Sequence, residues 1–292
     1  MNITKTNWFT KFVECLLVAI AFINTASMVL EFLPQSWFQK LGNNFDTIFF
    51  SAEYGIGLLF GIVYSIYWHK KEKKDATISG RKHAWMLGII RYWLAFEIST
   101  YGFAKILGTQ FHTPSYRKDM LLGEANGFAL TWYYYGYSYT LAVIIACTQI
   151  GGSILLLFRR TVLLGATILL PVLINILLIN VFFDIASGAF ANSVIFTIGL
   201  FFLFAMHWQL VKKVFVELKD GLPPLKFGFF KPILKLLPIV LAFAFIEYLI
   251  KNDESDKKLV GVWQVKQMVK NKDTVTAISW LTDTSSFKKV YF

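Results

Sequence analysis

An acid, a phenol and an amine recur at four-residue intervals within one apolar segment, residues 84–107: Glu97, Tyr101 and Lys105. On a helix these side chains and Arg91 fall within an arc of ~120°, so one stripe of the helix is polar. An ionisable side chain at the centre of a bilayer costs ~2.5–3.5 kcal/mol, which marks it as functional by default. We therefore expect the stripe to line a wet cavity that opens toward the outer leaflet and binds a polar headgroup or relays protons.

Other apolar segments carry polar residues at matching depths, at ~1.5 Å per helical residue. The outer layer of ligand-pocket candidates consists of Glu53, Glu97, Tyr101, Lys105, Asn175, Asn180 and Asp184, and the inner layer of Arg91 and Gln149. Interhelical polar contacts contribute ~0.6 kcal/mol each and serve packing, which is the favoured interpretation of the three amides alone. For Glu97, Tyr101 and Lys105 we favour a cavity. Together with Glu53 they place two acids and an amine in one layer, which is more than helix packing needs.

Aromatic residues gather in the run 131–140, after a polar region that begins at Gly108. Trp and Tyr rings favour headgroup depth, so an interfacial belt is the first interpretation of this run. The alternative is a stacking platform for a quinone or a lipid headgroup, with Trp132, Tyr133 and Tyr135 as the candidate platform residues.

The composition indicates the class of protein that holds these residues. Of 292 residues, 56% are apolar and 16% are charged, whereas a soluble domain has ~45–50% apolar and ~25% charged residues. This excludes a disordered chain and argues against a cytosolic enzyme. We predict an all-α membrane protein whose helices are long enough for a ~30 Å hydrocarbon core. The seven predicted transmembrane helices are residues 12–33, 45–68, 84–107, 138–158, 162–183, 189–211 and 232–250.

Basic residues concentrate on one side of these spans, above all in residues 69–83 and in the loop before the last span. The positive-inside rule then places the N-terminus in the cytoplasm and everything after Ile250 in the periplasm of a bacterial inner membrane. The net charge of +11 is thus a topology signal that also attracts anionic headgroups, and nucleic acid is not an expected partner. The first apolar run is too long for a removable signal peptide, so we expect it to stay in the mature protein.

Cysteine and histidine form no catalytic or metal-binding pattern. Cys15 and Cys147 lie in separate apolar segments without a C-x-x-C motif. The four histidines lie at span ends or in a loop, so no pair could bracket a haem within the membrane. We expect no haem or metal, and we identify no catalytic residue. The cofactor is left open, with a quinone as the candidate that the aromatic platform would suit.

The segment after the last span, residues 251–292, begins with a polar linker. Alternation in residues 259–269 predicts a half-buried strand, a turn follows at 271–273, and residues 274–281 and 287–292 predict further strands. Three short strands are too few for an independent core. We therefore expect this exported tail to pair with a membrane or periplasmic protein, or the chain to be part of a longer product.

The segment 91–111 resembles the signature helix of the DoxX-like membrane protein family. The family pattern of an Arg, a small residue and Tyr-Gly-x-x-Lys is similar to Arg91, Ala95, Tyr101, Gly102 and Lys105. Residues 152–165 resemble the family's glycine, aliphatic run, basic turn and second glycine. Asn175 and Asn180 resemble its Asn residues on the next helix.

This resemblance covers about residues 85–215 and implies a four-helix membrane unit. The family is named for a subunit of a thiosulfate:quinone oxidoreductase, and its members are associated with membrane redox complexes. A related group helps to mature a methylamine dehydrogenase. The family is also similar in architecture to vitamin K-dependent carboxylases, which would make Lys105 and the aromatic run neighbours of a quinone.

The expected organisation is two N-terminal spans with a basic cytoplasmic loop (1–84), a DoxX-like bundle (85–215), a last span (216–250) and a β-rich tail (251–292). The expected function is a quinone- or lipid-binding component of a membrane redox system. The alternative is a non-enzymatic scaffold that pairs its tail with an envelope partner.

Overall fold

The computed structural model describes residues 6–30, 32, 45–75, 77–112, 125–218, 230–252, 261–275 and 288–291. The chain divides into two compact units, Met1–Leu218 and Lys219–Phe292. The described part of the first unit is helical, and the described part of the second contains a helix followed by short strands.

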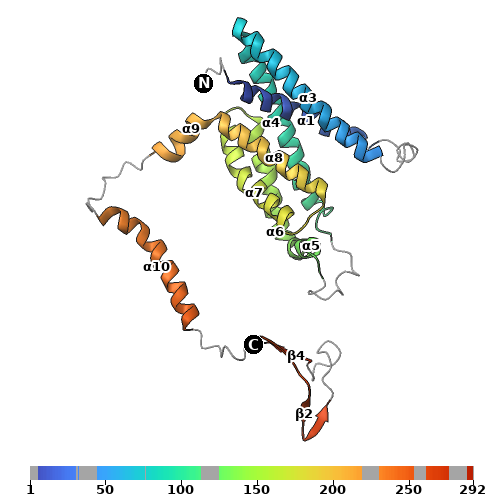
Figure 1. Ribbon diagram of the computed structural model, residues 1–292, viewed down its shortest axis with the longest axis vertical. Coiled ribbons are helices and arrows are strands. Elements are labelled where there is room, and N and C mark those ends of the chain that lie inside the picture. Colours follow the sequence, from blue (N-terminus) through green and yellow to red (C-terminus); the bar gives the residue numbers. More distant parts are fainter. Residues whose placement is uncertain are drawn as a thin grey trace. The chain divides into compact units, whose positions relative to one another are not determined.

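Long helices make up the first unit (Figure 1). In chain order they are α1 (Trp8–Leu30), α3 (Phe45–Lys74), α4 (Thr77–Ile106), α5 (Gly127–Tyr137), α6 (Tyr139–Leu157), α7 (Val162–Phe182), α8 (Ser187–Met206) and α9 (Trp208–Lys212), followed by a π-helical turn, Lys213–Glu217. Side chains cap the starts of α1, α5 and α6: Asn7 accepts a hydrogen bond from the backbone of Thr10 at 2.8 Å, Asn126 accepts one from Ala129 at 2.9 Å, and Ser138 accepts one from Leu141 at 3.3 Å. Such caps satisfy amide groups that have no partner within the helix.

Helix α4 is the central element of this unit. It packs along α6 and also contacts α1, α3 and α8, while α7 packs against both α6 and α8. The apolar core lies at these contacts, and several of its side chains have no exposed surface at all: Ile90, Leu94, Leu156, Leu169 and Leu200. Helices α4, α6, α7 and α8 therefore form a bundle, with α1 and α3 paired beside α4.

Small residues let α6 and α7 approach closely. A Cβ atom added to Gly165 would lie 2.8 Å from the carbonyl oxygen of Gly152, and one added to Gly152 would lie 2.6 Å from Leu169 Cγ. Close backbone approach at glycine is the usual way in which membrane helices pack. The two glycines that bracket the basic turn thus fix the crossing of α6 and α7.

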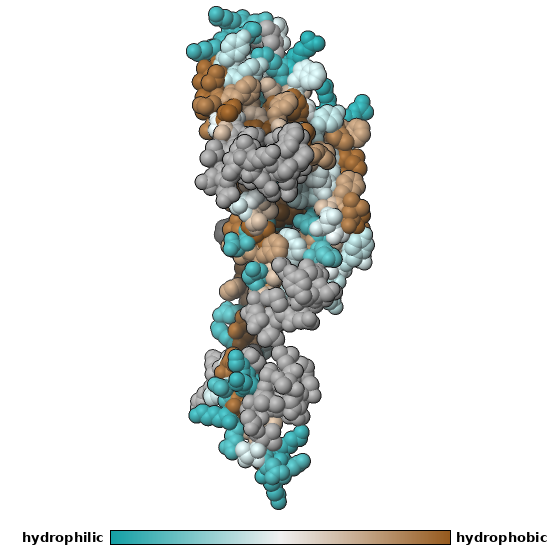
Figure 2. Space-filling view, turned by 90° about the vertical axis from the view of Figure 1, so that its right-hand side faces the viewer, coloured by the Kyte–Doolittle hydropathy of each residue, from teal (hydrophilic) through white to brown (hydrophobic). Residues whose placement is uncertain are grey.

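Among the described residues, five helices are long and apolar enough to cross a bilayer: Trp8–Val29, Tyr139–Leu157, Val162–Phe182, Ser187–Met206 and Ile233–Lys251. They indicate a multi-pass membrane protein. Figure 2 shows hydrophobic surface over much of the first unit and hydrophilic residues gathered at one of its ends. The two other spans that we predicted, 45–68 and 84–107, are helical as parts of α3 and α4, and their passage through the membrane stays a prediction.

Two regions of the first unit differ from the sequence prediction. The predicted helix 189–211 is interrupted, because α8 ends at Met206 and His207 leaves the helical conformation with φ −103° and ψ 21°. The His207 ring donates from Nδ1 to the carbonyl oxygen of Leu203 at 2.8 Å, which stabilises this break. The region 108–137, predicted as a loop outside the spans, contains the helix α5.

The second unit contains α10 (Lys231–Lys251), with Pro238 inside it, and four short strands among its described residues. The strands are β1 (Val262–Gln264), β2 (Met268–Lys270), β3 (Asp273–Val275) and β4 (Lys289–Tyr291). Strand β1 pairs antiparallel with β4, and β2 pairs antiparallel with β3. Asn271 and Lys272 join β2 to β3 with φ of 53° and 74°, the positive values that a tight two-residue hairpin turn requires.

The prediction of one strand over residues 259–269 is wrong. Residues 265–267 interrupt it, and the two resulting strands have different partners. The predicted strand 274–281 begins in β3, and its residues 276–281 lie outside the described part of the chain. The predicted strand 287–292 is present as β4.

Candidate functional site

A cavity of about 480 Å³ lies within the bundle of the first unit. Its walls come from α4, α6, α7 and α8, and α5 lines it at the end where α6 begins and α7 ends (Figure 1). The candidate residues that line it are Tyr101, Lys105, Trp132, Tyr135, Gln149, Asn175 and Asn180. Most of the other lining residues are aliphatic or aromatic, so a few polar groups converge on an otherwise apolar space.

Lys105 supplies a buried cation to this cavity. Lys105 is only 5% exposed. Its Nζ donates to the carbonyl oxygen of Tyr101 at 3.1 Å and to Gln110 Oε1 at 2.8 Å. Nζ also lies 5.5 Å from the centroid of the Phe111 ring. Within the described part of the chain no carboxylate forms an ion pair with it. The charge of Lys105 is therefore held only by neutral groups.

Gln149 is the most unusual residue of the cavity wall. It is 1% exposed, and its Oε1 has no hydrogen-bond partner among the described residues. One turn further along α6, the buried Ser153 Oγ is likewise without a partner there. A buried polar group without a hydrogen bond costs ~1–3 kcal/mol, so these two residues point to a polar group that the described part of the chain does not supply.

Two other polar contacts tie the cavity wall together. The Asn192 amide of α8 donates to the Tyr101 hydroxyl at 3.2 Å, and the Asn180 amide donates to Ser193 Oγ at 3.0 Å and to the carbonyl oxygen of Ala189 at 3.1 Å. These contacts fix α4 against α8 and α7 against α8. Asn180 is thus fully used in packing, whereas Gln149 is not.

An aromatic group forms the α5 side of the cavity. Phe111 stacks on Tyr135 at 4.9 Å between ring centroids and meets Trp132 edge-on at 5.3 Å. Phe111 has φ 63°, a conformation that is rare for a bulky residue and that concentrates at functional sites. Burial, and to a smaller extent the neighbouring Tyr134, raises the pKa of the Tyr135 phenol, so its hydroxyl stays protonated at neutral pH.

The start of α5 is packed against the turn that follows α7. A Cβ atom added to Gly127 would lie 2.4 Å from the carbonyl oxygen of Phe183. Only glycine allows this approach, and the approach determines where the aromatic residues of α5 lie.

The cavity reaches the surface of the bundle between α6 and α7. Ile144 on α6 and Asn175 on α7 both line the cavity, and both are exposed. Asn175 lies well inside an apolar span, where an amide on the surface is unfavourable unless it borders a polar space. This side is therefore an opening toward the surroundings of the helices.

Other candidates lie outside the cavity wall. Arg91 donates from Nε to the carbonyl oxygen of Leu156 at 2.9 Å and from Nη2 to that of Leu157 at 2.7 Å, so it caps the end of α6. Glu97 Oε1 accepts from Trp93 Nε1 at 3.2 Å, one turn back along α4.

The remaining three candidates are Glu53, Tyr133 and Asp184. Asp184 is exposed in the α7–α8 turn with φ 50°. Tyr133 is half-buried on α5 and is absent from the cavity lining. The side chain of Glu53 lies outside the described residues.

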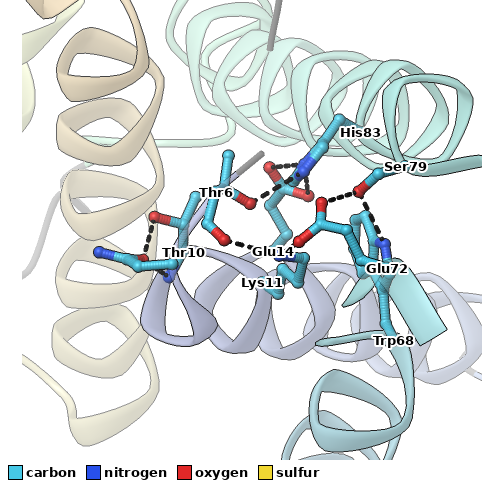
Figure 3. Close-up of polar contacts among 9 residues, drawn as sticks. Thr6, Thr10, Lys11, Glu14, Trp68, Glu72, Ser79 and His83 are labelled. Carbon is cyan, nitrogen blue, oxygen red and sulfur yellow. Dashed lines mark hydrogen bonds and ion pairs between the residues drawn. The ribbon is translucent and has the colours of Figure 1, made fainter. Parts of the chain in front are cut away.

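A second polar site lies where α1, α3 and α4 meet (Figure 3). Lys11 is fully buried and donates from Nζ to Glu72 Oε2 at 2.5 Å and to the carbonyl oxygen of Thr6 at 2.8 Å. The other oxygen of Glu72 accepts from Ser79, whose own oxygen accepts from Trp68 Nε1 at 3.1 Å. Burial alone would raise the pKa of Glu72, but the hydrogen bonds from Lys11 and Ser79 outweigh it and lower that pKa.

The same cluster contains a second ion pair. His83 Nδ1 lies 2.8 Å from both carboxylate oxygens of Glu14, and His83 Nε2 lies 3.0 Å from Thr6 Oγ1. The side chains of Glu14 and His83 are 0% and 2% exposed. The Trp68 ring lies 4.6 Å from the His83 ring. We call these seven residues the polar clasp: Thr6, Lys11, Glu14, Trp68, Glu72, Ser79 and His83.

Sequence analysis did not identify the polar clasp. Lys11 and His83 sit at the ends of predicted spans, where charges also serve as topology signals. A usable signal was the pair Lys11 and Glu14, three residues apart and so on one face of a helix within an apolar segment. Among the described residues, no group of three or more His, Cys, Asp and Glu side chains is arranged to bind a metal ion.

The chain is a multi-pass helical membrane protein, and sequence comparison adds a partial match. It is 39% identical over 95 residues to a protein of Bacillus subtilis (strain 168) described as the uncharacterized protein YwoB. The match covers 32% of this chain and 60% of that relative, so the chain spans less than two thirds of the relative's length. No family model matches, and no solved structure matches.

Proposed function

We propose that this protein binds a lipid-soluble ligand with an oxygen-bearing ring or headgroup, a quinone in the first instance, in the cavity between α4 and α8. In this proposal it is a DoxX-like component of a redox system in the bacterial inner membrane, with a cytoplasmic N-terminus and an exported tail. The observation that carries the proposal is the buried Oε1 of Gln149, which has no hydrogen-bond partner among the described residues and lies in the wall of an apolar cavity that also holds the Lys105 cation.

The size and lining of the cavity support a small-molecule site. Ligand pockets measure ~300–1,000 Å³ and are mainly apolar with a few polar groups that orient the ligand; this cavity measures about 480 Å³. The ammonium of Lys105 donates to a carbonyl or oxyanion, and the amide of Gln149 can donate or accept. A ring that carries oxygens at its edge accepts from Lys105 and, in its hydroxyl form, as in a quinol, also donates to Gln149 Oε1, while it stacks on Trp132 or Tyr135.

The opening beside Asn175 supports access from the bilayer rather than from water. The opening lies beside Asn175 of α7, and the side chains around Asn175 belong to a helix that is long and apolar enough to cross a bilayer. A quinone or a lipid enters such an opening with its ring or headgroup and leaves its chain in the bilayer. Glu97, which we expected beside the ligand, is occupied by Trp93 and has no role in this proposal.

The test is a titration of the full chain in lipid nanodiscs with menaquinone and ubiquinone. Trp132 lines the cavity, so we expect saturable quenching of tryptophan emission that is lost in Trp132→Phe. Lys105→Met should weaken binding by about tenfold, since a charge-assisted hydrogen bond contributes ~1.5–3 kcal/mol. Lys235→Met, in α10 of the second unit, is the matched control and should bind normally. No saturable response to either quinone would exclude the quinone, and a response unchanged in Lys105→Met would exclude this cavity.

A second candidate function is a scaffold that presents its tail to an envelope protein. The favouring observation is that β1–β4 and β2–β3 are separate two-stranded pairs in the described residues. Isolated pairs are marginally stable, and their edges can accept a further strand. The test is removal of residues 251–292. Retention of every co-purifying protein after this deletion would contradict the scaffold function.

A further inference from the structure

The polar clasp holds two ion pairs of different chemical character. Lys11 and Glu72 form an ammonium–carboxylate pair in which the hydrogen bonds from Lys11 and Ser79 lower the pKa of Glu72. Glu14 and His83 form a pair that contains the one side-chain type whose charge normally changes between pH 5 and 8. A cluster that only locks helices together would be served as well by a second Lys or Arg.

The contact between His83 and Thr6 tolerates both protonation states of the imidazole. When the ring is neutral with its proton on Nδ1, it donates to Glu14, and Nε2 accepts from the Thr6 hydroxyl. When Nε2 gains a proton, it donates to the same hydroxyl oxygen, because a threonine O–H can rotate from donating to accepting. His83 can therefore bind or release a proton without losing either hydrogen bond.

The charges around His83 favour a single exchangeable proton. With the proton bound, the pairs Lys11–Glu72 and Glu14–His83 are both neutral overall. Without it, one negative charge remains on Glu14, at a residue with no exposed surface. The neighbouring cations Lys11 and Lys82 partly compensate this negative charge. Lys11 acts electrostatically on Glu14. The Lys82 ammonium lies 5.6 Å from the centroid of the Trp68 ring, and this ring packs on His83.

Among the described residues, the remaining titratable group beside this pair is the Cys15 thiol, which is fully buried next to Glu14 in sequence. From α3 the pair is faced by Glu72, which is itself occupied by Lys11 and Ser79. Thr6 is half-buried and precedes α1, so the Nε2 side of His83 is the side nearest to water. The opposite side of the ring is closed by Glu14.

We propose that the Glu14–His83 pair is a proton-binding site that exchanges one proton at His83 Nε2 with water on the side of the N-terminus, with Thr6 as the hydrogen-bond partner in both states. The proton comes from water and returns to it, so no other reactant takes part. This site is separate from the ligand cavity and does not depend on any ligand binding there.

The test is a pH titration of the full chain in nanodiscs with ¹⁵N-labelled histidine, followed by NMR of the ring nitrogens. The His83 signals are those lost in His83→Gln. We expect the Nε2 signal to convert between its unprotonated and protonated positions between pH 5 and 8, while Nδ1 stays protonated throughout. His207→Gln is the matched control and should leave this conversion unchanged.

Two variants at one position separate the proposed site from a fixed structural pair. Thr6→Val removes the hydroxyl and should move the midpoint of the His83 conversion to lower pH by about 0.5–1 unit, because the charged imidazolium loses a stronger hydrogen bond than the neutral ring does. Thr6→Ser keeps the hydroxyl and should leave the midpoint unchanged. Glu14→Gln should move it further down, by about 1–3 units.

A His83 ring whose nitrogen signals stay constant from pH 5 to 8 would overturn the proposal, since the pair would then be a fixed lock. Equal midpoints in Thr6→Val and Thr6→Ser would overturn the role of Thr6. The two Thr6 variants test the proposal even if Glu14→Gln does not fold. Thr6 lies outside the helices, so its substitution does not disturb helix packing as Glu14→Gln does.

Discussion

Arg91 of α4 donates a hydrogen bond from Nε to the carbonyl oxygen of Leu156, 2.9 Å away at the end of α6. The last carbonyl groups of a helix have no partner within it and carry partial negative charge. A buried guanidinium that reaches two of them satisfies both groups at once. Arg91 is therefore a helix cap that joins α4 to α6.

The first prediction follows from this cap. Arg91→Met should lower the free energy of unfolding by about 2–4 kcal/mol, because it leaves two carbonyl groups unpaired where hydrogen bonds to a charged donor contribute ~1.5–3 kcal/mol. Arg91→Lys should be intermediate, since an ammonium cannot reproduce the fork of the guanidinium. Thermal unfolding in detergent measures this, with the exposed Arg159 as control (Arg159→Met). An unchanged midpoint in Arg91→Met would contradict the capping role.

The second prediction concerns Gln149, whose Oε1 is buried without a partner in the described structure. Gln149→Leu has about the same volume and removes that amide. It should raise the unfolding free energy of the ligand-free protein by about 1–3 kcal/mol and at the same time weaken ligand binding. Thermal unfolding and the quinone titration measure the two effects. A destabilised variant would show that another polar group satisfies Gln149 in the free protein.

The third prediction concerns the position of α5. Gly127→Ala places a Cβ atom 2.4 Å from the carbonyl oxygen of Phe183, so the start of α5 must move away and carry Trp132 with it. Stability should fall by about 1–3 kcal/mol, as for other overpacked sites, and the tryptophan signal of ligand binding should weaken. Gly188→Ala is the control, because no atom lies within 4 Å of its added Cβ. Equal behaviour of the two variants would show that α5 is not packed in this way.

The fourth prediction is a pH dependence that originates at Glu72. Its folded-state pKa is lowered from 4.5, so ionised Glu72 contributes stability that is present above pH 4.5 and is lost as pH falls through the folded value. The difference in thermal midpoint between wild type and Glu72→Gln should therefore be largest near neutral pH and shrink below pH 4.5. Glu217→Gln, which removes an exposed ion pair with Lys212, should show a difference near zero at every pH. A wild-type advantage that does not shrink as the pH falls below 4.5 would contradict this origin.

Uninterrupted apolar runs made most of the helices predictable. The predicted helix 162–183 differs from α7 by one residue at one end, because Leu, Ile and Val supply 14 of its 22 residues and none is charged. The aromatic run was harder, since Trp and Tyr favour both strands and membrane interfaces. The helix α5 is revealed instead by Asn126, a cap residue that precedes it.

The spacing of Tyr101 and Lys105 predicted that both face the bundle interior, and the structure places both in the cavity wall. The same spacing placed Glu97 beside them, but helical periodicity does not determine where a side chain bends. Glu97 turns back to Trp93, four residues earlier. The side of a helix on which a residue lies can thus be predicted from its position in the sequence, whereas its hydrogen-bond partner depends on which residues lie near it in the fold.

The polar clasp could not be predicted from the sequence, for a different reason. Lys11 and Glu72 are separated by 61 residues, and Glu14 and His83 by 69. A single sequence does not pair charges over such separations, so each was interpreted on its own as a feature of a span end. Only the fold brings α1, α3 and α4 together at that point.

Helix α4 is one continuous helix of 30 residues from Thr77 to Ile106, which makes it ~45 Å long. This exceeds the ~30 Å thickness of the hydrocarbon core, so the predicted span 84–107 would place the two ends of α4 at opposite aqueous boundaries of the membrane. His83 lies near one end and Lys105 near the other. A displacement of α4 as a rigid body would therefore move His83 and Lys105 together.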